Sequence, residues 1–153
     1  IFICKVTTIN TDIIHNLTSL FHSLSQLDAI GAERQALQEK HQHSEEERDG
    51  LENRIRELEA KIQQHSQTSS LQGGRINIAH ARKKRTLDET YDSRLDKLER
   101  NREEMSSIDD ALKEVLDRKE IQEDRRKETE RALVEILLDQ SKKVIQILNG
   151  TLT

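Results

Sequence analysis

The segment His65-Ser66-Gln67-Thr68-Ser69-Ser70-Leu71-Gln72-Gly73-Gly74 decides how the rest of the chain folds. It gathers small polar residues and contains the only Gly-Gly pair, a composition typical of a turn or linker. The stretches on both sides have the spacing of long helices. If the chain reverses here, the helices pair as an antiparallel hairpin; if it only bends, they form an extended rod. The Gly-Gly pair favours the hairpin.

The composition of the flanking stretches indicates an all-α protein. The 153 residues include no proline, which costs roughly 3 kcal/mol inside a helix, so long uninterrupted helices are favoured. Hydrophobic residues make up 33% of the chain and charged residues 35%. This apolar content is too low for a thick core, but narrow seams between helices need far less. The sequence therefore predicts a coiled coil.

Residues 9–66 form the first predicted helix. From Leu27 onward one heptad frame fits, with position a at Leu27, Arg34, His41, Arg48, Ile55 and Ile62 and position d at Ile30, Leu37, Ser44, Leu51, Leu58 and His65. Before it, the apolar stripe runs through Ile13, Leu17, Leu20, Leu24 and Leu27 and is widened by Ile14 and Phe21. Two successive steps of three then predict a stammer before Ile30. The polar and Gly-containing middle predicts an irregularity over 31–50.

Residues 76–148 form the second predicted helix, with a restart near residue 107. Its frame places Tyr91, Leu98, Met105, Leu112, Leu133 and Ile147 at a and Leu87, Ile108, Val115 and Ile136 at d. Residues 1–8 are expected to be extended or frayed, 67–75 to form the turn or linker, and 149–153 a C-terminal tail. Two seams with polar middles give a monomer little stability, so a dimer is expected for the hairpin and the rod alike. One form of it is a four-helix bundle of two hairpins through 9–30 and 132–148.

No catalytic, cofactor or metal site is predicted, and the chain is expected not to be an enzyme. There is no Gly-rich phosphate loop, and the single cysteine excludes multi-cysteine metal motifs. His41 and His43 are two residues apart and so point to different sides of a helix, unlike zinc ligands at i and i+4. His41 and His65 at seam positions also allow a pH-responsive seam.

The charge pattern bears on partners and location. The net charge is −4, with both signs interleaved, so nucleic acid is an improbable partner. No apolar run approaches the 18 residues of a transmembrane helix, and a cytoplasmic location is expected. The chain lacks an initiator methionine, which suggests a segment of a larger protein.

The leading functional hypothesis is a scaffold or interaction module that binds a helical protein partner, as in cytoskeletal, kinetochore, centrosome or vesicle-tether proteins. The predicted partner-binding residues are charged groups at seam positions and the one basic cluster: Arg34, Arg48, Lys119, Arg126, Arg82, Lys83, Lys84 and Arg85.

Two alternatives remain. A membrane-apposed module would use the apolar helix 9–30 and the basic cluster 82–85. An extracellular or viral stalk is suggested by the glycosylation patterns at Asn16-Leu17-Thr18 and Asn149-Gly150-Thr151.

Overall fold

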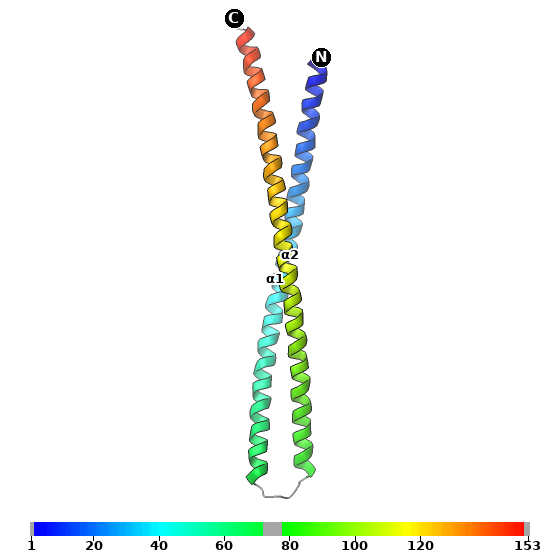
Figure 1. The fold of residues 1–153 in the computed structure, drawn as a ribbon, viewed down its shortest axis with the longest axis vertical. Helices are drawn as coiled ribbons and strands as arrows, with labels where there is room; N and C mark the ends of the chain where they lie inside the picture. Colours follow the sequence, from blue (N-terminus) through cyan, green and yellow to red (C-terminus); the bar gives the residue numbers. More distant parts are fainter. Residues whose placement is uncertain (1, 72–77, 152–153) are drawn as a thin grey trace. The chain divides into compact units, whose positions relative to one another are not determined.

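The computed structural model consists of two long helices, α1 (Phe2–Leu71) and α2 (Ile78–Thr151), which pack against each other in opposite directions (Figure 1). It describes the backbone of residues 2–71 and 78–151 and the side chains of 10–68 and 78–150. The all-α class is confirmed, and the arrangement is that of a helical hairpin. The predicted turn residues Gly73 and Gly74 lie outside the described residues.

Both helices extend beyond the predicted limits. α1 begins at Phe2, so the extended or frayed stretch expected over 1–8 is helical from Phe2 onward, and α1 continues to Leu71. α2 ends at Thr151. β-branched and small polar residues lower helix propensity by less than about 1 kcal/mol each, and each residue added to an existing helix gains a backbone hydrogen bond. The hydroxyls of Ser66 and Thr68 donate to the carbonyls of Ile62 and Gln64 at 3.0 and 2.8 Å, within the helix.

The expected interruptions are absent from these helices. α1 is continuous through 31–50, and α2 is continuous through residue 107. A single helical glycine costs only about 1 kcal/mol relative to alanine, and tertiary packing outweighs such a local preference. A Cβ atom added at Gly31 or Gly50 would meet no atom within 4 Å.

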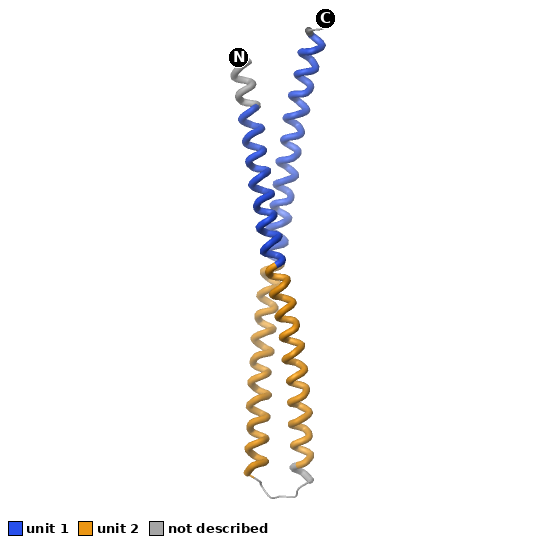
Figure 2. Tube along the Cα trace, turned by 180° about the vertical axis from the view of Figure 1, so that it is seen from behind, with its two compact units in different colours: residues 1–35, 113–153 blue, residues 36–112 orange. Residues whose placement is uncertain are grey.

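The chain divides into two compact units, each containing a stretch of both helices (Figure 2). Unit 1 comprises residues 1–35 and 113–153, and unit 2 comprises residues 36–112.

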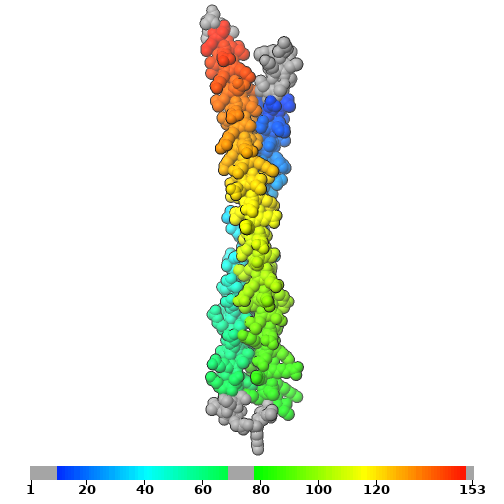
Figure 3. Space-filling view, in the orientation of Figure 1, coloured from blue at the N-terminus to red at the C-terminus, as the bar shows by residue number. Residues whose placement is uncertain are grey.

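Unit 2 has a narrow hydrophobic core. Leu51 and Ile55 of α1 and Leu98 of α2 form its buried cluster, and Tyr91 packs against it. Ile108 is buried as well. Side chains of the two helices lie against each other along this unit (Figure 3). Within this unit, the seam that the heptad frame predicts is the core.

Unit 1 buries less. Its buried residues include Ile30 and Val115, and also the polar Ser23. Its two helical segments draw apart toward the chain ends (Figures 1 and 2), and the side chains of 141–150 are all exposed, among them the predicted seam residue Ile147.

The buried and half-buried residues of α1 keep one heptad phase, and no stammer occurs. Before Leu27 the seam contains Asn16 and Ser23, whereas Leu17 and Leu24 are each 38% exposed. Keeping one phase avoids the local overwinding that a stammer imposes. The polar replacements are tolerable because they are small. The Asn16 amide also donates to the carbonyl of Asp12 at 2.9 Å.

Candidate interaction surfaces

A polar layer interrupts the apolar seam of unit 2. Asn101 and Ser44 are both buried, and the Asn101 amide nitrogen donates to the Ser44 backbone carbonyl at 3.1 Å. His41 lies nearby on α1, with its Nε2 3.2 Å from the Asp109 carboxylate and its Nδ1 3.8 Å from that of Glu45. The Asn101–Ser44 hydrogen bond and the His41–Asp109 contact join the two helices, whereas the His41–Glu45 contact lies within α1. Directional polar contacts between helices restrict their register more than apolar packing does.

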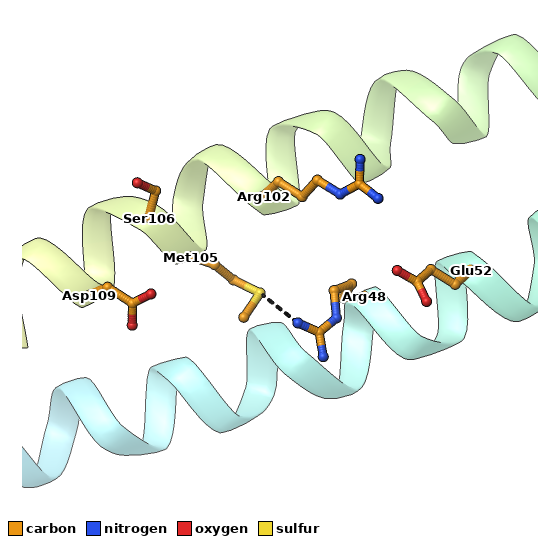
Figure 4. A pocket seen from close by; sticks show the side chains of 6 residues that line it. All are labelled: Arg48, Glu52, Arg102, Met105, Ser106 and Asp109. Atoms are coloured by element: carbon orange, nitrogen blue, oxygen red, sulfur yellow. Dashed lines mark hydrogen bonds between the residues drawn. The ribbon is translucent and has the colours of Figure 1, made fainter.

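Arg48 lies beside this layer and lines a pocket of about 500 Å³ within unit 2 (Figure 4). Its guanidinium points toward Met105 of α2, with 3.9 Å between Nη1 and the sulfur. The other lining residues are Glu52, Arg102, Ser106 and Asp109. Two guanidinium groups and two carboxylates balance in charge, so the lining offers both donors and acceptors for polar contacts.

Charge pairs between the helices lie at the g positions that follow from the heptad frame. In unit 2, Lys40 Nζ is 3.1 Å from the Glu104 carboxylate. In unit 1, Arg118 Nη2 is 2.7 Å from the Glu33 carboxylate. The hydrogen bond that Arg118 donates to Glu33 raises the pKa of Arg118 against the opposing effect of desolvation. Antiparallel pairing therefore brings the g position of one helix to the g position of the other within each unit.

The part of unit 2 near residues 65 and 80 holds two further contacts. His65, predicted at a d position, is buried, and its ring stacks on that of His80. Desolvation lowers the pKa of His65, assisted by His80, Lys83 and Lys84. Tyr91, predicted at an a position, is half-buried, and its hydroxyl donates to the Glu59 carboxylate at 2.9 Å.

The predicted partner-binding residues fall into two groups. The seam residues Arg34, Arg48, Lys119 and Arg126 are half-buried. Lys119 and Arg126 also pair along α2 with Glu123 and Glu130, at 3.5 Å each. The basic cluster Arg82–Arg85 is exposed, and Arg85 Nε is 2.8 Å from the Glu89 carboxylate. The structure does not gather the eight residues into one site.

Sequence reasoning missed two buried polar seam residues, Ser23 and Asn101, in addition to the half-buried Asn16. Both occupy d positions when the frame is written out through every heptad, because Ser23 lies seven residues before Ile30 and Asn101 seven before Ile108. Extending the heptad frame to every position would have predicted both residues. Following only the apolar residues did not.

No family model, curated protein or solved structure matches this chain. Over the described residues, neither helix has a stretch that is long and apolar enough to cross a membrane. The same part of the chain contains no group of three or more His, Cys, Asp or Glu side chains placed to hold a metal ion.

Proposed function

We propose that this chain is a non-enzymatic coiled-coil module of a larger protein, which dimerises and binds a helical protein partner in the cytoplasm. The observation that supports this proposal is the seam between α1 and α2, which keeps a heptad spacing and carries charged residues at several of its layers. Arg34 and Arg48 occupy a positions of α1 and are only half-buried. A cytoskeletal, kinetochore, centrosome or vesicle-tether setting would use such a module.

The energetics of these layers favour a partner-binding role. A charged side chain at a seam position contributes less to helix pairing than leucine or isoleucine, and it commonly specifies register or partner. The guanidinium groups of Arg34 and Arg48 are partly exposed to a carboxylate on an approaching helix, which at Arg48 would compete with the Asp49 carboxylate 3.3 Å away. Arginine suits this contact because its planar fork binds a carboxylate through two hydrogen bonds.

The test compares an Arg34→Leu, Arg48→Leu double variant with the wild-type chain. We expect its thermal midpoint to rise, by roughly 2–4 °C for each kcal/mol gained, because leucine fills the seam. We also expect it to retain less of the partner, which is first identified by cross-linking in extracts of the source cells and then purified for a binding measurement.

The matched control replaces Arg54 and Arg100, which are exposed and lie outside the seam, with leucine. This control should bind the purified partner as the wild type does. Unchanged partner binding by the seam variant would contradict the proposed role of Arg34 and Arg48.

The second candidate is a membrane-apposed module, favoured by the exposure of Ile14 and Phe21 on α1 and of the basic cluster Arg82–Arg85 on α2. It predicts salt-sensitive co-sedimentation with anionic liposomes, and no sedimentation removes it. The extracellular stalk receives less support. Asn16, whose amide nitrogen would carry the glycan, is a half-buried seam residue. The same nitrogen donates a hydrogen bond to the carbonyl of Asp12.

A further inference from the structure

Exposed large hydrophobic residues are concentrated in unit 1. Thirteen of the fifteen in the described part of the chain belong to it, and only Ile78 and Leu95 belong to unit 2. Four lie on α1: Ile14, Leu17, Phe21 and Leu24. Nine lie on α2: Leu116, Ile121, Val134, Leu137, Leu138, Val144, Ile145, Ile147 and Leu148. Water therefore contacts more apolar surface in unit 1 than a helix pair of this width normally leaves uncovered.

Most of these residues share one side of the helix pair. Their heptad positions are e and b: e for Leu17, Leu24, Leu116, Leu137 and Val144, and b for Ile14, Phe21, Val134 and Leu148. The Glu33–Arg118 pair shows that the g positions of the two helices meet at one edge of the seam. The e positions of both helices consequently flank the opposite edge. We call these nine residues the e face.

The e positions of unit 2 have the opposite character. They include Glu45, Glu52, Glu59, Asp88, Arg102 and Asp109, and Leu95 is the one large hydrophobic residue among those the structure describes. A uniform two-helix coil would carry mainly polar e positions, as unit 2 does, whereas the e positions of unit 1 are mainly apolar apart from Glu123 and Glu130 on α2. The e face widens the apolar stripe of unit 1 beyond an a/d seam, which is the pattern of helices that contact more than one neighbour.

The size of the e face fits a stable interface. Its nine side chains are between 38% and 67% exposed. A whole large side chain has on the order of 150 Å² of surface, so the exposed parts of the nine together present roughly 700 Å² of apolar surface. The largest apolar patch on a monomer is typically about 300–600 Å². Two such faces together would bury roughly 1,400 Å², within the range of about 1,200–2,000 Å² for specific interfaces.

We propose that the e face of unit 1 packs on the e face of a second copy of this chain, so that two copies form a four-helix bundle there. This inference rests on the proposed function, which includes a dimer, and it assigns the surface through which that dimer forms. The α1 segment of the face contains no Asp, Glu, Lys or Arg between Asp12 and Asp28. It therefore offers no charge by which a charged partner could be recognised. The charges at the e positions of the α2 segment, Glu123 and Glu130, are paired along α2 with Lys119 and Arg126. A second copy supplies a matching apolar face, it is always present, and twofold symmetry makes the contact self-complementary.

The test uses two charge variants of the full chain. In the first, Leu17, Leu24 and Leu137 are replaced by glutamate; in the second, the same three residues are replaced by lysine. The mass in solution is measured by light scattering on a size-exclusion column, and helicity by circular dichroism. The wild type should have about twice the 17.8 kDa chain mass, and each variant alone should be a monomer. Mixing the variants should restore the dimer, and also helicity if either variant alone is unfolded.

The matched control is Leu95→Glu, which alters an e position of unit 2 with the same 38% exposure as Leu17 and Leu24. This variant should remain a dimer. A glutamate variant that stays dimeric would overturn the e face as the interface while leaving a dimer at another surface. A monomeric wild type would overturn the dimer itself, and if that monomer sedimented with anionic liposomes, a membrane would be the occupant of the face.

Discussion

The imidazole rings of His65 and His80 are stacked, with their centroids 3.5 Å apart and their planes inclined by 17°. One ring comes from α1 and the other from α2, so the stack joins the two helices of unit 2. Among the described residues, the Nε2 atom of each ring is buried without a hydrogen-bond partner. The neutral His65 ring stacks in this way, whereas its protonation would place a positive charge at a buried position.

This stack predicts that the hairpin loses stability as the pH falls. The pKa of His65 is lowered from 6.5 by desolvation first, then by His80, Lys83 and Lys84, with Asp88 opposing. The α1 charge one turn away, Lys61, is also positive. The unfolded chain binds a proton at His65 more tightly than the folded chain does. The contribution of His65 to the free energy of unfolding is therefore complete above pH 6.5, and it is lost as the pH falls through 6.5 toward the lowered pKa. Thermal melts at several pH values should show a lower midpoint in acid.

His65→Gln should flatten this pH dependence. His43→Gln, which changes an exposed histidine of the same unit, should leave it intact. Equal pH profiles for the two variants would show that the stack does not carry the effect.

Tyr91 should titrate above its ordinary range. Its pKa is raised from 10.0, chiefly by the hydrogen bond to Glu59 and further by desolvation. The chain has one tyrosine and no tryptophan, so absorbance near 295 nm reports this side chain alone. Glu59→Gln should lower the midpoint toward 10.0, and Asp92→Asn should lower it less. A wild-type midpoint at the value of the urea-unfolded chain would mean that the bond does not persist in solution.

Asn101→Leu should stabilise unit 2 and weaken its register. The Asn101 side chain is 4% exposed, and its Oδ1 atom is buried without a hydrogen-bond partner among the described residues. Leucine removes that cost, which is about 1–3 kcal/mol for a buried unsatisfied group, so the thermal midpoint should rise.

The register is measured by the distance between spin labels at positions 40 and 104, which face each other across the helices. The distribution should broaden in Asn101→Leu and stay narrow in the control Asn53→Leu, an exposed site on α1. A single narrow distance in both variants would show that apolar packing alone sets the register.

Gly50→Ala should stabilise the chain by roughly 0.5–1 kcal/mol, the usual gain from alanine inside a helix. A Cβ atom at this position meets nothing within 4 Å, so no packing cost opposes the gain. Denaturant titration measures the change. Gly150→Ala is the control, and it should contribute less because the last turn of a helix frays. A loss of stability in Gly50→Ala would indicate an interruption of α1 at this point.

The helical class was predictable, because the absence of proline acts through local backbone preferences. The sequence favoured the hairpin but left the extended rod open, because that choice depends on packing between the helices. The heptad frame also located Tyr91 and His65 correctly. The stammer was wrong because the prediction followed the most apolar residues, Leu17 and Leu24, whereas the helices kept one phase and accepted Asn16 and Ser23 in the seam. The stack with His80 and the bond from Asn101 could not be predicted, since both depend on how far one helix is shifted along the other.

The unbroken phase of α1 has a consequence for how this chain can change in length during evolution. Each residue advances the helix by about 100°, so one inserted residue would turn every later side chain of α1 away from the seam. A change of seven residues restores the facing direction, but it shifts α1 along α2 unless α2 changes by seven as well. Homologues should therefore differ in length by matched heptads in the two helices, and single-residue gaps should fall outside them.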